Sequence, residues 1–107
     1  MIFRLFYSGK VDEFAKNLAQ DIAKRYPPVI ANSPEQTVSQ KRVGEILEEA
    51  FTRAHQFSRE NRLGMIGRAK LGHAFKWKLR YMGYEEKFVE MVTEALVVAV
   101  YRARGPK

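Results

Sequence analysis

The chain has 107 residues, 46% of them hydrophobic, which lets one domain of this size build a core without covalent staples. It contains no cysteine, so disulfide frameworks, cysteine-ligated zinc and thiol catalysis are excluded. The net charge is +7, and residues 62–82 supply six of these charges because they hold six basic side chains and no acid.

The first predicted helix covers about residues 9–26, with Ser8 as its N-cap, and Pro27 and Pro28 end it. Its apolar positions recur at three- and four-residue spacing, as on one face of a helix. They are Val11, Phe14, Ala15, Leu18, Ile22 and Tyr26. Before it, Met1–Tyr7 is too apolar to stay in water. For this segment we expect an extended conformation that completes the core or contacts a second copy of the chain; contact with a membrane surface is the less favoured alternative.

The second predicted helix begins with a capping box, in which Ser33 is the N-cap, Pro34 the first helical residue and Gln36 the N3 residue. Its apolar stripe is Val43, Ile46, Leu47, Ala50, Phe51, Ala54 and Phe57. The helix should end near residues 58–62, and Gly64 and Gly67 mark the turn that follows. This turn is longer than that of a helix-turn-helix unit, which disfavours that DNA-binding fold.

The third predicted helix ends at Gly83, a left-handed C-cap, and the fourth runs from about Tyr84 to Arg102. The inner stripe of the fourth helix is Tyr84, Phe88, Val92, Ala95, Leu96 and Ala99. Its outer face is Glu86, Glu90, Thr93 and Glu94. No other segment offers a strand that could pair with the apolar residues 95–101. The sequence therefore predicts an all-α fold, a compact bundle of about four helices.

We expect a cytoplasmic, soluble protein that forms a single helical domain over residues 1–107. The longest apolar run, residues 95–101, is far shorter than the roughly 20 residues that cross a bilayer. Arg4 interrupts the apolar N-terminal stretch, and the small-residue cleavage site of a secretory signal is missing. No membrane span is expected.

The third helix carries the unusual chemistry of this chain. Leu71, Phe75, Leu79 and Met82 fall within one arc and predict its core stripe. The remaining surface mixes basic and aromatic side chains, and a charge excess this local is informative about partners. Cations attract phosphates without regard to sequence, and flat rings can stack on unpaired bases. The predicted nucleic-acid-binding residues are Arg68, Lys70, His73, Lys76, Trp77, Lys78, Arg80 and Tyr81.

Other interpretations of this helix stay open. Trp77 and Tyr81 could pack against the first helix, since most aromatic residues at helical spacing belong to a core. The acidic row of the fourth helix, Glu86, Glu90 and Glu94, could neutralise the basic helix across the hairpin or from a second copy. The alternative function is therefore a protein-interaction or homo-oligomeric module, for example a homodimer, that uses the same surface to meet an acidic partner.

No catalytic or cofactor motif is present. The chain has no phosphate-binding loop, dinucleotide fingerprint or nucleophile elbow. His55 and His73 lie on different predicted helices, and neither has a carboxylate or histidine three or four residues further along the chain, as a metal site on one helix face would require. We expect a small basic protein that binds and is not an enzyme, with no cofactor and no metal.

Overall fold

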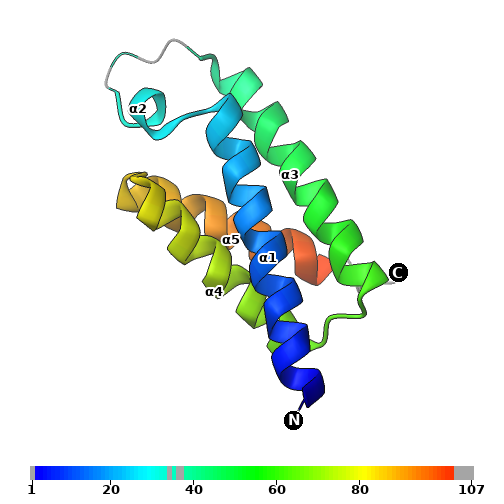
Figure 1. Ribbon diagram of the computed structural model, residues 1–107. Coiled ribbons are helices and arrows are strands. Elements are labelled where there is room, and N and C mark those ends of the chain that lie inside the picture. Colours follow the sequence, from blue (N-terminus) through cyan, green and yellow to red (C-terminus); the bar gives the residue numbers. More distant parts are fainter. Residues whose placement is uncertain (1, 34, 36–37, 103–107) are drawn as a thin grey trace.

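The computed structural model describes residues 2–33, 35 and 38–102, and the side chains within 9–33, 35 and 38–101. The described residues form five helices and no strand (Figure 1). The helices are α1 (Ile2–Arg25), α2 (Pro28–Ala31), α3 (Gln40–Glu60), α4 (Met65–Met82) and α5 (Glu86–Arg102). The prediction of an all-α bundle is confirmed, with one short helix more than expected. No described helix has the length and the apolar character that crossing a membrane requires.

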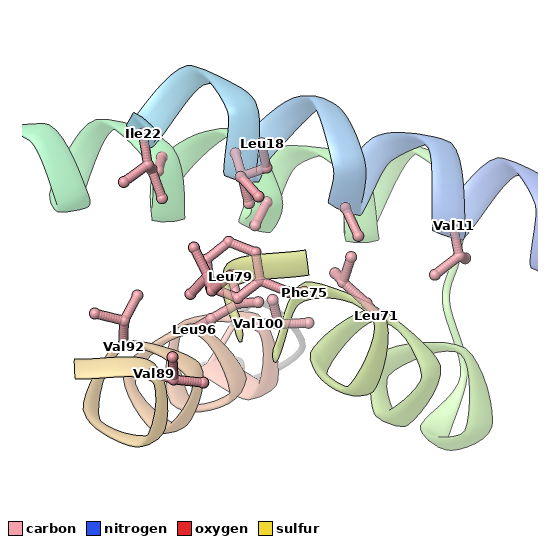
Figure 2. Packing of buried hydrophobic residues seen from close by; sticks show 14 of the residues in the cluster. Val11, Leu18, Ile22, Leu71, Phe75, Leu79, Val89, Val92, Leu96 and Val100 are labelled. Atoms are coloured by element: carbon pink, nitrogen blue, oxygen red, sulfur yellow. The ribbon is translucent and has the colours of Figure 1, made fainter. Parts of the chain in front are cut away.

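The helices form two layers, with α1 and α3 in one and α4 and α5 in the other (Figure 2). The molecule measures 47 × 31 × 19 Å along its principal axes, so it is flat. Leu18 and Ile22 of α1 point across the layers toward Phe75 and Leu79 of α4. The largest fully buried side chains are Phe75, Leu18, Ile22, Leu71, Leu79, Leu96, Val11, Val89, Val92 and Val100.

The predicted core faces of the first three long helices are confirmed, with Phe51 half-buried at the edge of the core. The predicted inner face of α5 is rotated from the observed one. Val89 and Val100 are buried there, which moves the inner arc by about 60°. Thr93, predicted on the outer face, is half-buried, and its hydroxyl oxygen is inaccessible and has no hydrogen-bond partner.

The expectation of an extended N-terminus is wrong for the residues that the structure describes. Helix α1 begins at Ile2, so Ser8 lies inside it and is not its N-cap. Met1 lies outside the described residues. No proline interrupts residues 2–25, and a single glycine inside a helix costs only about 1 kcal/mol relative to alanine. Gly9 therefore does not prevent the helix from continuing toward the N-terminus.

The predicted start of the second long helix is also wrong. Helix α3 begins at Gln40, and its N-cap is Ser39, whose hydroxyl accepts a hydrogen bond of 3.1 Å from the Arg42 amide. The hydroxyl of Ser33 instead accepts a bond of 3.2 Å from the Glu35 amide, which makes a local turn. Pro34 and Gln36, the other members of the predicted capping box, lie outside the described residues.

Two glycines determine how α4 and α5 meet. Gly83 has φ = +106°, the left-handed conformation that closes α4 as predicted. Gly72 is buried on the side of α4 that faces α5, where an added Cβ would lie 2.9 Å from a methyl carbon of Val97. Gly67, predicted in a turn, is instead buried inside α4. The absence of a side chain at Gly72 therefore allows the two helices to approach closely.

Hydrogen bonds join the α4–α5 turn to the segment around α2. The Asn32 side chain donates a bond of 2.8 Å to the carbonyl of Gly83 and accepts one of 3.1 Å from the amide of Glu85. The buried Tyr84 hydroxyl donates a bond of 2.5 Å to the carbonyl of Tyr26. Burial disfavours the phenolate and raises the pKa of Tyr84 to about 12. These bonds hold the C-terminal end of α4 in place.

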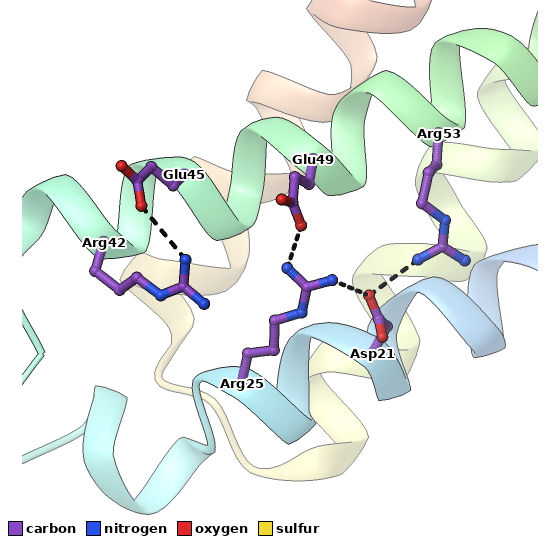
Figure 3. A network of polar contacts seen from close by, with 6 residues as sticks. All are labelled: Asp21, Arg25, Arg42, Glu45, Glu49 and Arg53. Carbon is purple, nitrogen blue, oxygen red and sulfur yellow. Dashed lines mark hydrogen bonds and ion pairs between the residues drawn. The ribbon is translucent and has the colours of Figure 1, made fainter.

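Ion pairs connect α1 and α3 along their exposed edge (Figure 3). Asp21 of α1 accepts from Arg53 of α3 at 2.9 Å and lies 3.5 Å from Arg25. Arg25 also pairs with Glu49 of α3, and this bond raises the pKa of Arg25 and lowers that of Glu49. Ion pairs that are exposed to solvent contribute little to stability. The pairs of Arg25 with Glu49 and of Asp21 with Arg53 join the two helices of this layer.

Candidate nucleic-acid interface

Helix α4 is covered by α1 on one side and by α5 on the other. Gly72 faces α5, and Lys78 reaches Asp12 of α1. Between these two sides one strip of α4 remains exposed to solvent. Its side chains are Ile66, Lys70, His73, Trp77 and Tyr81. Because residues 62–82 contain no acid, this strip is apolar, aromatic and cationic without a negative charge of its own.

The aromatic rings of the strip are on the surface. Trp77 is 51% exposed and Tyr81 is 92% exposed, so the interpretation that they belong to the core is wrong. The rings of His73 and Trp77 meet edge to face, with centroids 6.2 Å apart and planes inclined at 70°. The guanidinium carbon of Arg80 lies 4.8 Å from the centre of the Trp77 ring. A cation–π contact at this distance orients the indole.

Arg80 is neutralised across the α4–α5 turn. Its Nε donates to Glu86 at 3.0 Å and its Nη2 donates to the other carboxylate oxygen at 2.5 Å. This two-bond contact, more than the nearby charge of Lys76, holds the pKa of the Glu86 carboxyl below its usual value. It raises the pKa of Arg80 in turn. The interpretation that the acidic row neutralises the basic helix therefore holds at Arg80.

Lys76 and Lys78 differ in what they meet. The Lys78 ammonium lies 3.7 Å from the Asp12 carboxylate, so this ion pair joins α4 to α1. Lys76 is half-buried on the side of the strip nearest α5, close enough to Glu86 to affect that carboxyl electrostatically. Lys70 is exposed on the strip itself. The cations nearest the exposed rings, apart from Arg80, are therefore Lys70 and Lys76.

The expectation that Arg68 reaches solvent is wrong. Arg68 is only 7% exposed, and its Nη1 donates a bond of 2.7 Å to the carbonyl of Leu63. Its guanidinium carbon lies 4.7 Å from the centre of the Tyr101 ring on α5, and its Nε is buried without a hydrogen-bond partner. Arg68 fastens the α3–α4 connection to α5. It is not available to a phosphate at the surface.

Sequence reasoning did not find the acid of α1 that meets Lys78. Asp12 lies far from the basic helix in the chain, so no pattern within one helix could indicate this contact. Glu86, by contrast, was visible as a member of the acidic row. The exposed Ile66 was also missed as part of the surface of α4, because it falls in what was predicted to be a turn.

Nothing in the described part of the chain gathers three or more histidine, aspartate or glutamate side chains in a metal-binding arrangement. His55 lines a shallow depression of 410 Å³ on α3 together with Thr52, Gln56, Arg59 and Glu60. His73 borders a wider one of 760 Å³ between α1 and α4. Both depressions are open to solvent, and the two histidines lie in different ones.

Comparisons with known proteins give no relative from which a function could be transferred. The chain matches no protein-family model, no curated protein and no solved structure. The function must therefore be argued from the surface of α4.

Proposed function

We propose that this chain is a non-enzymatic nucleic-acid-binding protein that contacts its ligand through the exposed strip of α4. The observation that supports it most is the exposure of Trp77 and Tyr81 next to Lys70 and Lys76, on a helix without acids. Exposed aromatic rings beside cations combine the two contacts that nucleic acids offer, base faces and phosphates.

The structure changes the expected strength of the electrostatic contribution. Of the predicted cations, Arg68 is buried, Lys78 meets Asp12 and Arg80 meets Glu86. We assign the phosphate contacts to Lys70 and Lys76, the two lysines that lie beside the rings on the strip. Neutralising two phosphates of a single strand gives a slope of log K against log salt of about −1.4. Engagement of the five predicted lysines and arginines would give a slope of about −3.5.

The test is fluorescence anisotropy with a labelled, unstructured 20-nucleotide strand at 50 mM salt and at increasing salt concentrations. Lys70→Glu combined with Lys76→Glu should weaken binding and flatten the salt slope. The matched control is Lys41→Glu, since Lys41 is exposed on α3 in the other layer and its replacement changes net charge in the same sense. Circular dichroism checks that each variant remains helical.

Three results would count against the proposal. One is the absence of affinity for any nucleic acid at 50 mM salt. Another is equal weakening by Lys41→Glu, which would mean that net charge alone attracts the ligand. The third is an unchanged affinity in the double variant, which would move the contact away from α4.

A second candidate function is self-association, and a separate surface favours it. The outward face of α5 carries Met91, Val98 and Tyr101, which are 55%, 45% and 38% exposed, together with the charged Lys87 and Glu94. Burying the three apolar side chains against a second copy would remove apolar area from water. Sedimentation equilibrium should then show a dimer that Val98→Glu converts to monomer. A 12.4 kDa species at high concentration would remove this candidate.

A further inference from the structure

Three exposed rings follow one another along the strip of α4. His73, Trp77 and Tyr81 are spaced four residues apart, so each lies about 6 Å further along the helix axis than the one before it and about 40° around it. All three are exposed to solvent. We call these residues the ring row. Lys70 lies at its N-terminal end, and Lys76 runs along its edge toward α5.

The middle ring is held in place before any ligand arrives. The guanidinium of Arg80 covers part of Trp77 at 4.8 Å, and Glu86 fixes that guanidinium with two hydrogen bonds. His73 contacts the same indole from the neighbouring turn. Holding an aromatic side chain in one orientation reduces the conformational entropy that binding would otherwise remove. Glu86 therefore supports the row even though it neutralises Arg80.

The geometry of the ring row suits unpaired bases. In a duplex the faces of the bases are stacked on one another, so a side-chain ring on the outside cannot reach them. Successive nucleotides of one duplex strand, and with them the stacked bases, are about 3.4 Å apart along the axis. Successive rings of the row are about 6 Å apart along the helix axis, so their spacing does not match stacked bases. A strand with its bases unstacked and spread can place one base against each ring.

The charge of the strip leads to the same conclusion. Duplex binding without base contacts depends on many phosphate contacts, whereas Lys78 pairs with Asp12, Arg80 pairs with Glu86 and Arg68 is buried. Stacking contributes about 1 to 3 kcal/mol per base and does not depend on many cations. Stacking involves the face of the base and leaves the sugar outside the contact, so it does not distinguish ribose from deoxyribose.

From these observations we infer that the ring row binds single-stranded nucleic acid, one base per ring, in preference to duplex and without discrimination between ribose and deoxyribose. This inference rests on the proposed function, because it assigns the class of nucleic acid that the same strip of α4 takes.

The experiment compares three labelled ligands with the full chain: a 12-nucleotide oligo(dT), the corresponding oligo(U) and a 12-base-pair duplex. Both single strands should bind at least tenfold more tightly than the duplex, and their affinities should agree within about threefold. Trp77 is the only tryptophan of the chain, so its fluorescence reports on the row directly. Single strands should quench this fluorescence, whereas the duplex should not.

Variants at the most exposed ring provide the second readout. Tyr81→Leu should lower the affinity for both single strands at least fivefold and leave the weak duplex affinity unchanged, since stacking of one base is lost. Tyr81→Phe is the matched control, because it retains the ring and should bind like the parent chain. At 92% exposure, Tyr81 can be replaced without disturbing the core.

The outcomes separate the two proposals. Equal or tighter binding of duplex, or full single-strand affinity in Tyr81→Leu, would overturn the single-strand inference and leave nucleic-acid binding by α4 standing. A consistent preference for one sugar would overturn the claim that the site ignores the 2′-hydroxyl. If no ligand of the three binds at 50 mM salt, the inference and the proposed function fail together, and self-association through α5 becomes the leading function.

Discussion

Replacing Gly72 with alanine tests the contact between α4 and α5 on which the exposure of the strip depends. Alanine is favoured over glycine inside a helix by about 0.8 to 1.0 kcal/mol. The new Cβ, however, would lie 2.9 Å from the Val97 methyl carbon, and overpacking of this kind costs about 1 to 3 kcal/mol. The sum is a destabilisation of about 0 to 2 kcal/mol.

Gly44→Ala is the control, because Gly44 is exposed inside α3 and an added Cβ there meets nothing within 4 Å. It should stabilise the protein by about 0.8 to 1.0 kcal/mol. Urea unfolding of both variants should therefore give free energies that differ by about 1 to 3 kcal/mol, the size of the overpacking contribution alone.

A double-mutant cycle identifies the cause. In a Val97→Ala background the methyl group that Gly72→Ala would meet is absent, so Gly72→Ala should become as stabilising as Gly44→Ala. If Gly72→Ala stabilises the protein that much with Val97 still present, the two helices do not approach closely at this point. The boundary of the exposed strip of α4 on the side of α5 would then differ from the observed one.

Further predictions concern the core and the bonds around the α4–α5 turn. Because folding raises the pKa of Tyr84 to about 12, the unfolded chain loses this proton first as the pH rises, and the free energy of unfolding should fall between about pH 10 and 12. Urea unfolding should therefore show a smaller stability difference between the parent chain and Tyr84→Phe at pH 11 than at pH 8. Asn32→Ala removes two hydrogen bonds and should cost about 1 to 2 kcal/mol in the same assay, and a loss below 0.5 kcal/mol would mean that water replaces them. Phe75→Ala should cost about 3 to 5 kcal/mol and the half-buried Phe51→Ala less, so the reverse order would contradict the observed burial.

The core could be predicted wherever one face of a helix is apolar and the other polar. Leu71, Phe75 and Leu79 repeat every four residues, and all three are fully buried. The second half of α5 is apolar on almost all sides, so its pattern does not define a direction, and the predicted face was wrong by about 60°. Helix α2 has four residues, too few to show any periodicity.

That basic and aromatic residues share one helix could be predicted from the sequence, but the surroundings of each side chain could be predicted only in part. The angle of Tyr81 on the helix places it outside the core stripe, but the sequence left open whether it packs against another helix, and the structure shows that it is exposed. The burial of Arg68 does not, because it depends on the carbonyl of Leu63 and on the ring of Tyr101, which lies in another helix. The same holds for Lys78, whose partner Asp12 is brought near only by the folded chain. A long cationic side chain can reach partners on other helices, and the sequence of its own helix does not identify those partners.

The side chain of Asn32 makes bonds to residues 51 and 53 positions away in the chain, the carbonyl of Gly83 and the amide of Glu85. Each bond joins the residue that follows α2 to the turn between α4 and α5. Exchange of the Glu85 amide proton with solvent therefore requires the two segments to separate. Such a link makes local opening cooperative, because α2 cannot detach while the α4–α5 turn stays closed. The C-terminal end of the ring row and the connection after α1 should consequently show similar hydrogen-exchange protection.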